Sequence, residues 1–548
     1  MRNSTRRTVL GASIAVAGTG ILAACSGSGH SGHGGSGGEE GSGGTGSGSG
    51  SAPKGYVDPA GPEVAAAEKQ RGSGPVRAVR LTAAATSLDL GGRTVRSWAY
   101  GGELPGKEVR VTAGDTLALT LANHLPQPTS LHWHGLALRN DMDGVPDLTQ
   151  RAVRPGGDFT YRFAVPHPGT YWFHPHSGTQ QDRGLYAPLI VEDPKEPLSY
   201  DKEWVVVLDD WVDGVDGSTP DAVLNGLRGG MGGGMDMGDS GGSEAGGADG
   251  GHSGHDMSSM SLRGQESPPA GPSRMLMGSS SDLLGGDAGD VAYPYYLVNG
   301  RTATDPSVFR ARPGDRIRIR LVNAGSDTAF RVALGGHEMT VTHTDGFPVR
   351  HAATDALLLG MGERYDVLVT VKDGVFPLTA LAEGKKASAL ALLRTGGGSA
   401  PSAGVRPKEL DGRLLTADKL TADESVALPR KKPDRTVTLQ LTGGMEKYDW
   451  AFDKKPYRAD QRHPVRAGER VRLVFANSTS MWHPVHLHGH TFALANVAGG
   501  PRKDTALVLP NGTLTVDFDA DNPGLWMIHC HNVYHAEAGM MTVLGYRS

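Results

Sequence analysis

The chain has 548 residues, a formal net charge of −5 at pH 7, and only two cysteines, Cys25 and Cys530. The near balance of 54 basic and 59 acidic residues gives no reason to expect a nucleic-acid partner, and two cysteines exclude a disulfide scaffold. With 38% apolar residues the chain can bury a core, and its length predicts about three domains.

Residues 1–25 have the features of an export signal. Arg6 and Arg7 precede an apolar run at 11–24, which is shorter than the roughly 20 residues that span a bilayer. The arginine pair resembles a twin-arginine signal, and the letters LAAC, ending at Cys25, resemble a bacterial lipobox. We expect export, acylation of Cys25 and a lipid-anchored lipoprotein on the outer face of the cytoplasmic membrane, in the cell envelope. The alternative is an ordinary secretory signal with an incidental cysteine.

Three segments of biased composition separate the rest of the chain. Residues 26–74 begin as a Gly/Ser-rich tract, typical of a flexible tether. A tract rich in Gly, Met and His, at about 214–290, is predicted to be an insertion in the second domain, and 396–433 is predicted to be an interdomain linker. The predicted folded domains are therefore 75–195, 196–395 and 434–548.

Three segments of the chain repeat one pattern. They are Val111–His124, Ala311–Ala324 and Val465–Ser478, and each has a Gly, an acidic residue, alternating apolar positions and an Asn nine residues after the Gly. Strict alternation indicates β-strands. Three copies predict three related all-β domains.

Paired histidines follow the first and third repeats but not the second. Nine residues after the Asn stands His132 of HWHG in the first copy, His486 of HLHG in the third, and Val332 in the second. A second match, PGTYWFHPH with PGLWMIHCH, places a His five residues after a Gly, where the middle domain has Thr379. We therefore expect the middle domain to act as a spacer. The eight histidines are His132, His134, His174, His176, His486, His488, His529 and His531.

Four His-x-His pairs predict a metal cluster. Residues i and i+2 of a strand lie on one face about 6.5–7 Å apart, so each pair can aim two imidazoles into one site. Eight imidazoles exceed the needs of one metal but suit two or three, and imidazole ligation favours copper or zinc. A single His-x-His is most often an ordinary polar pair, but four at matched offsets in two related domains disfavour that alternative.

Cys530 stands between His529 and His531, so its side chain points to the opposite face of the strand. His483, His535 and Met540 lie near it in the sequence. Two His, one thiolate and a weak axial Met form the blue-copper electron-transfer site, whereas zinc takes a tetrahedral set of strong ligands. The alternative is a buried structural thiol. The pattern predicts that electrons enter singly at a copper on one side of the strand and pass through the backbone to the cluster.

These motifs closely resemble those of the three-domain multicopper oxidases, the group of laccases and bacterial copper-efflux oxidases. The resemblance covers residues 75–548 and implies three consecutive cupredoxin-like Greek-key β-barrels. It also implies an oxidase with four coppers that reduces O₂ to water. The implied type-1 ligands are His483, Cys530, His535 and Met540. The implied type-2 ligands are His132 and His486, and the implied type-3 ligands are His134, His174, His176, His488, His529 and His531.

The resemblance also extends to residues beyond the ligands. The stretch DMDGVP places Asp143 where the family has an acid near the cluster, so Asp143 is the candidate proton donor, unless it is a plain turn residue before Gly. Met481 stands where efflux oxidases place a Met that helps to bind substrate Cu(I). Two family acids are missing, because Thr479 and Ala536 stand in their places.

More narrowly, the chain resembles an actinobacterial lipoprotein branch linked to copper tolerance. Three functions remain open: a cuprous oxidase, a laccase-like oxidase of phenols or aromatic amines, and a copper-sequestering lipoprotein without catalysis. Because thioethers prefer Cu(I), the Met/His-rich insertion is either a collector of cuprous ions or a tract of drifted composition. Three domains in one chain permit a monomer, which we expect.

Overall fold

The computed structural model describes residues 54–229 and 271–548, which belong to one compact unit. The predicted export signal with Cys25, most of the predicted tether, and residues 230–270 of the insertion lie outside the described residues. Within the described ranges, no helix combines the length and apolar character needed to cross a membrane.

The described chain folds as three all-β domains, each built from two sheets, which confirms the predicted fold class. In the first domain one sheet has the order β2-β1-β4-β6 and the other the order β3-β8-β7-β5. The first of these sheets consists of β2 (Thr94–Tyr100), β1 (Val76–Asp89), β4 (Thr116–His124) and β6 (Asp158–Ala164). The second consists of β3 (Val109–Thr112), β8 (Ala187–Glu192), β7 (Gly169–His174) and β5 (His132–His134).

The middle domain has the largest sheets. The first consists, in order, of β13 (Arg301–Thr302), β12 (Tyr295–Val298), β9 (Lys202–Trp211), β15 (Arg316–Asn323), β20 (Arg364–Thr370), β17 (Met339–Thr344) and β18 (Phe347–Thr354). The second consists of β14 (Ser307–Arg310), β22 (Ala387–Arg394), β21 (Val375–Ala382), β16 (Phe330–Leu334), β19 (Ala356–Leu359) and β23 (Leu414–Leu415).

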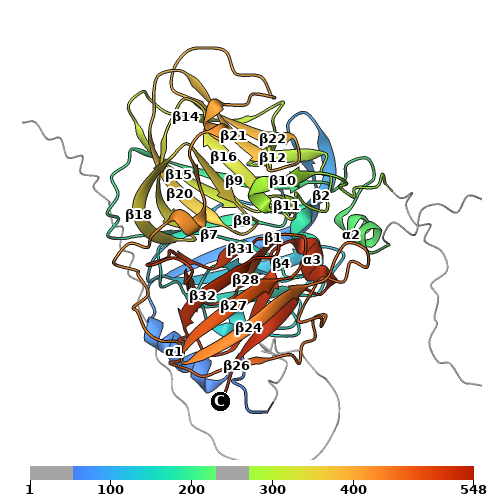
Figure 1. Cartoon of the computed structure of the whole chain (residues 1–548), viewed down its shortest axis with the longest axis vertical. Helices are drawn as coiled ribbons and strands as arrows, with labels where there is room; N and C mark the ends of the chain where they lie inside the picture. The colour runs from blue at the N-terminus through green and yellow to red at the C-terminus, as the bar shows by residue number, and fades with distance from the viewer. Residues whose placement is uncertain (1–53, 230–270) are drawn as a thin grey trace, which may run out of the picture. The chain divides into compact units, whose positions relative to one another are not determined.

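The third domain repeats the plan, and Figure 1 labels its strands β24, β26, β27, β28, β31 and β32. One sheet consists of β25 (Ala451–Phe452), β24 (Arg435–Thr442), β27 (Arg470–Asn477), β32 (Thr513–Asp519), β29 (Phe492–Leu494) and β30 (Arg502–Lys503). The other consists of β26 (His463–Val465), β34 (Met541–Tyr546), β33 (Leu525–Cys530), β28 (His483–Leu487) and β31 (Thr505–Val508).

The three sequence repeats occupy one position in the three domains. They end in β4, β15 and β27. Each of these strands pairs in parallel with the strand that opens its domain and antiparallel with a later strand. The shared topology confirms that the repeats mark related domains.

The paired histidines come from strands that are neighbours in a sheet. His132 lies opposite His174, and His486 lies opposite His529. In the middle domain Val332 lies opposite Ala380. The offset of five residues from Gly374 predicts Thr379 at this place. In the structure Thr379 lies opposite Ala333 instead, so the pairing is shifted by one residue.

The residue between two histidines anchors each strand to the core. Trp133 is completely buried, and its ring packs 5.7 Å and 5.0 Å, between centroids, from Tyr161 and Phe163 of the other sheet. Since side chains alternate across a strand, this packing turns His132 and His134 to the opposite face.

The predicted segment boundaries need correction. Residues 62–71 of the predicted tether form helix α1 (Pro62–Arg71), with Val64 buried. This helix begins with Pro and contains an Ala run, both of which favour a helix rather than a flexible tether. Within the predicted insertion, residues 220–229 form α2 (Pro220–Gly229), and β10 (Ser280–Ser281) pairs with β11 (Gly286–Asp287). Each segment therefore contains regular elements among its described residues.

Candidate metal centres

The eight paired histidines converge where the first and third domains meet. Imidazoles from the two domains stack on one another, His132 on His488 at 3.7 Å and His134 on His486 at 3.8 Å between ring centroids. All of these side chains except His176, which is half-buried, are buried. We call this set of eight rings the imidazole seam.

Backbone carbonyls fix the protonation of four of these rings. His132 Nδ1 lies 2.9 Å from the carbonyl oxygen of Asp143, and His486 Nδ1 lies 2.9 Å from that of Asp504. His174 and His529 make the same contact, at 3.0 and 2.8 Å, with the carbonyls of the residues that follow them. Because a carbonyl can only accept, each Nδ1 donates, which leaves Nε2 of a neutral ring as a lone pair.

Carboxylates orient two further rings, one through its Nδ1 and the other through its Nε2. His488 Nδ1 lies 2.8 Å from Asp143 Oδ2, and His134 Nε2 lies 3.0 Å from Asp504 Oδ1. His488 therefore presents Nε2 to the centre of the seam, whereas His134 presents Nδ1. Each aspartate thus serves one imidazole through its carbonyl and another through its carboxylate.

The free nitrogens of the seam suit metal cations. Nε2 of His488 and Nε2 of His529 lie only 3.1 Å apart although neither carries a proton to share. Nε2 of His132, His174 and His486 and Nδ1 of His134 are buried without a hydrogen-bond partner. Lone pairs that face one another in a buried site need a cation between them.

The surroundings of the seam favour neutral imidazoles. Burial, with added repulsion from neighbouring imidazoles, lowers the pKa of His134, His174, His176, His486, His488, His529 and His531. A neutral ring is the form that binds a metal.

A second centre lies on the other face of β33. Sγ of Cys530 lies 3.6 Å from Nδ1 of His483 and 3.6 Å from Nδ1 of His535, and these two nitrogens are 3.0 Å apart. The three atoms form a buried triangle of the size that a single metal ion would bridge. Met540 is buried, and its carbonyl accepts from Cys530 N at 3.0 Å, which keeps it beside the thiol.

Both imidazoles of this second centre are capped on their outer side. His483 Nε2 lies 2.9 Å from Thr479 Oγ1, and His535 Nε2 lies 2.9 Å from Asp290 Oδ2. Burial alone would lower the pKa of His535, but the Asp290 carboxylate outweighs it and raises this pKa to about 10. Met481 is also buried, with 2% of its surface exposed. Neither imidazole edge is therefore open to solvent.

One strand joins the two centres. Cys530 belongs to the second centre, while its neighbours His529 and His531 belong to the imidazole seam. The covalent connection that the sequence predicted is therefore present in the backbone.

The expectation that the middle domain is only a spacer is wrong. Its Arg364 donates from Nη1 and Nη2 to the two carboxylate oxygens of Asp504, at 2.7 and 2.6 Å. Burial alone would raise the pKa of Asp504, but Arg364 and His134 hold it well below its usual range. Asp345 and Glu363 of the same domain pair with Lys503 at 3.0 Å each.

Sequence reasoning missed Asp504, Arg364 and Asp290. Their partners lie far away in the chain, so no local spacing marks them. Asp143 lies where it was predicted, completely buried against His132 and His488, and its Oδ1 has no hydrogen-bond partner.

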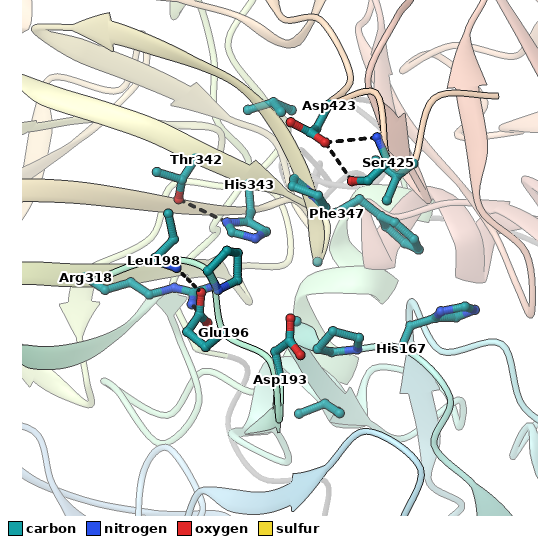
Figure 2. Close-up of a pocket in the computed structure, with 18 of the residues that line it drawn as sticks. His167, Asp193, Glu196, Leu198, Arg318, Thr342, His343, Phe347, Asp423 and Ser425 are labelled. Atoms are coloured by element: carbon teal, nitrogen blue, oxygen red, sulfur yellow. Dashed lines mark hydrogen bonds and ion pairs between the residues drawn. The ribbon is translucent and has the colours of Figure 1, made fainter. Parts of the chain in front are cut away.

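A cavity of about 600 Å³ lies away from both centres (Figure 2). It is lined by the end of the first domain, the middle domain and the linker, with His343 and Asp423 on its wall. None of the predicted ligands lines it. In the described part of the chain, each side-chain group that could hold a metal belongs to the seam or to the second centre.

Comparison with known proteins places the chain in one family. Models described as multicopper oxidase match residues 82–196, 270–398 and 430–547. The chain is 48% identical over 476 residues to multicopper oxidase MmcO of Mycobacterium tuberculosis, covering 86% of this chain and 88% of that protein. It is 28% identical to a copper resistance protein A homolog of Pseudomonas syringae pv. tomato, covering 84% and 90%. The solved multicopper oxidase of Pseudomonas thermotolerans matches with a TM-score of 0.62 and 26% identity, covering 86% of this chain and 99% of that one.

Proposed function

Because the chain belongs to the multicopper oxidase family, whose members are copper-dependent oxidases, we propose that its two centres hold four coppers. The type-1 copper would be held by His483, Cys530, His535 and Met540. The type-2 copper would be held by His132 and His486. The type-3 pair would be held by His134, His174, His176, His488, His529 and His531.

The observation that carries this assignment is the set of buried imidazole lone pairs that face one another on one side of β33, with a thiol and two imidazoles on the other. Bound there, copper would supply one-electron oxidation of the substrate and four-electron reduction of O₂ to water. The protein lowers the pKa of seven seam histidines, buries the second centre completely and joins the two centres through the peptide bonds around Cys530. Asp143 is our candidate for proton delivery, because its Oδ2 lies 2.8 Å from His488 Nδ1 and its Oδ1, 3.2 Å from His132 Nδ1, has no hydrogen-bond partner.

For the substrate we propose Cu(I), oxidised in the service of copper tolerance. The capped imidazoles support a small reductant, because a bulky phenol cannot reach the ring edge of His483 or His535. Asp290 bonds His535 through Oδ2 and leaves its other oxygen without a partner. Met481 remains our candidate for assisting Cu(I), although its burial requires a local opening before the side chain can meet an ion from solvent.

Oxidation of phenols or aromatic amines is the second candidate, and one observation favours it. An apolar cavity of about 530 Å³ is lined by Leu283, Leu507 and Leu509. It runs along β31, in which Val508 lies opposite His483. A flat aromatic molecule in this cavity would lie close to the type-1 centre.

Oxygen-electrode kinetics on the copper-loaded protein tests both candidates. Cu(I) should drive rapid O₂ uptake, and Leu507→Trp, which narrows the apolar cavity, should leave this rate unchanged while lowering phenol turnover. Fast phenol turnover beside negligible Cu(I) turnover would instead make the enzyme laccase-like. Stoichiometric copper binding without any O₂ uptake would indicate a copper-sequestering lipoprotein and overturn the enzymatic assignment.

We further propose that the protein is exported folded and anchored through a lipid on Cys25, on the outer face of the cytoplasmic membrane. The support is the arginine pair and the lipobox-like sequence, followed by Gly and Ser. Cys25→Ser should release the protein from the membrane fraction, with its O₂ uptake intact. We expect the protein to be a monomer, which light scattering on the soluble variant would test.

A further inference from the structure

The trinuclear centre depends on a residue from the domain that supplies none of its ligands. We propose that Arg364 of the middle domain is a positioning residue that acts through Asp504 on the orientation of His134 and His486. This inference rests on the copper assignment proposed above.

His134 needs an external group to fix its orientation. It is the ring that presents Nδ1, rather than Nε2, to the seam, and its Nδ1 is buried without a partner. Its Nε2 is held by Asp504 Oδ1 and by Thr505 Oγ1, both at 3.0 Å. If Asp504 turned away, the ring would lose its charged partner and could rotate its free nitrogen out of the site.

Asp504 in turn serves both sides of the seam. Its carbonyl accepts from His486 Nδ1 at 2.9 Å, while its carboxylate accepts from His134. The same carboxylate oxygen that holds His134, Oδ1, also lies 3.5 Å from His486 Nδ1, so displacement of this carboxylate would disturb a type-2 ligand and a type-3 ligand together.

Arg364 holds the same carboxylate through both of its oxygens, including Oδ1, which accepts from His134. Two parallel N–H···O bonds fix the plane of the carboxylate as well as its position. The guanidinium is itself held by the carbonyls of Thr170, at 3.1 Å from Nε, and Gly362, at 3.0 Å from Nη1. Thr170 lies in the first domain, so one buried side chain ties all three domains together at the seam.

The neighbouring glycine leaves room for this pair. Gly135, directly after His134, has φ +87°, and an added Cβ would overlap Arg364 Nη2 and Asp504 Oδ2. The Gly of the HWHG motif is thus required by the arginine–aspartate pair as well as by the backbone conformation.

Comparison with Asp143 separates positioning from proton handling. Asp143 makes the same two kinds of contact, through its carbonyl to His132 and through its carboxylate to His488. In the described part of the chain, no arginine or lysine pairs with it. The two aspartates therefore have different roles: one is clamped by a guanidinium and orients its rings, and the other has a carboxylate oxygen that makes no hydrogen bond and lies 3.2 Å from His132 Nδ1.

The test compares Arg364→Gln with Arg318→Gln. Arg318 is a matched control, because it is also buried in the middle domain and paired with a carboxylate, Asp366, at 2.5 Å, but it bonds Asp366 and Glu196 rather than Asp504. The copper-loaded variants are titrated with a copper chelator and followed by electron paramagnetic resonance and by the thiolate-to-copper absorption. Loss of a group that orients metal ligands typically weakens metal binding 10–100-fold.

We expect Arg364→Gln to retain trinuclear copper about 10–100-fold less tightly and to gain signal from uncoupled type-3 copper, with the type-1 absorption unchanged. Arg318→Gln should change neither. Arg364→Lys keeps the charge but not the two parallel bonds, so its copper retention should lie between those of the other two variants. It replaces Arg364→Gln in the test if that variant does not fold. Equal copper retention in Arg364→Gln and Arg318→Gln, or equal losses at both centres, would overturn the inference. A wild-type protein that binds no copper would instead refute the copper assignment.

Discussion

The outer and middle domains share one strand arrangement and differ in the side chains at one register. His132 faces His174 in the first domain and His486 faces His529 in the third, whereas Val332 faces Ala380 in the second. The backbone plan is the same in all three. The metal centre is therefore encoded by side chains on a common scaffold, and the scaffold alone does not predict it.

The middle domain nevertheless contributes charge where the outer domains contribute ligands. Arg364 reaches Asp504, and Gly362 lies so close to the seam that an added Cβ would come within 2.9 Å of His134. Ligands and their orientation are thus divided between domains. Substitutions that give an outer domain the side chain of the middle domain, or that remove one contribution at a time, can separate the roles of the domains.

The largest effect is expected when an outer domain is given the side chain of the middle one. His132→Val removes a ligand nitrogen from the seam and copies position 332. We expect O₂ uptake to fall by more than about 100-fold, the upper range for losing only a supporting residue of a metal site. Copper content measured by mass spectrometry should fall, while the circular dichroism signal of the β-sheets should remain that of the wild type.

Val332→Ala is the matched control in the middle domain. It should leave copper content and O₂ uptake unchanged and cost about 1–2 kcal/mol of stability, through a small cavity. Full O₂ uptake in His132→Val would show that the shared register does not decide where copper binds.

Cys530→Ser tests the opposite face of the same strand. The hydroxyl is a poor substitute for a thiolate, so the blue absorption and electron entry should vanish. Because the neighbouring imidazoles are untouched, most of the trinuclear copper should remain by elemental analysis. Parallel loss of all copper would mean that the two faces of β33 do not act as separate sites.

Acid should destabilise the copper-free protein through the outer domains. Burial lowers the pKa of seven seam histidines in the folded state, so below the ordinary pKa near 6.5 the unfolded chain binds more protons than the folded one. Stability is thus fully present above about pH 6.5 and falls below it, by up to about 1.4 kcal/mol per pH unit for each ring. Urea denaturation at pH 7 and pH 5 measures this, and copper-free His174→Ala should show a shallower slope. If stability falls equally steeply with pH in the wild type and in His174→Ala, the seam histidines are not the cause of the acid sensitivity.

The sequence predicts which histidines converge, because the geometry that brings them together is local. A strand repeats every two residues, so His-x-His and His-Cys-His fix which side chains share a face without knowledge of the fold. Spacing could not reveal Asp504, Arg364 or Asp290. Asp504 meets His134 across 370 residues, Arg364 meets Asp504 across 140, and Asp290 meets His535 across 245. Such contacts arise from how the domains pack, and a single sequence carries no periodic signal for them.

A smaller effect is expected at the cap of the type-1 centre. Asp290 places a carboxylate on His535, whereas Thr479 places a neutral hydroxyl on His483. An anion on a ligand imidazole makes it a stronger donor and favours the oxidised metal. Asp290→Asn should therefore raise the type-1 reduction potential by about 60 mV, equivalent to a tenfold change for a one-electron couple. Spectroelectrochemical titration measures the shift, and Thr479→Val, which removes no charge, should move it less. An unchanged potential in Asp290→Asn would mean that the cap excludes solvent without tuning the centre.

The smallest effect concerns the insertion in the middle domain, whose counterpart the outer domains lack. Deletion of residues 231–270 removes Met231, Met235, Met237, Met257 and Met260 but spares Met275, which bridges to Val291 beside Asp290. The deletion must not extend to Leu276, because Leu276 N donates to the carbonyl of Asp290 at 2.8 Å and Asp290 in turn holds His535. If the thioethers collect cuprous ions, the apparent KM for Cu(I) should rise a few-fold while kcat and phenol oxidation stay the same or improve. Replacing the same five methionines by leucine keeps the length of the segment and should reproduce the rise in KM, which separates thioether binding from a steric role. If neither change alters the KM for Cu(I), the insertion does not supply cuprous ions to the type-1 centre.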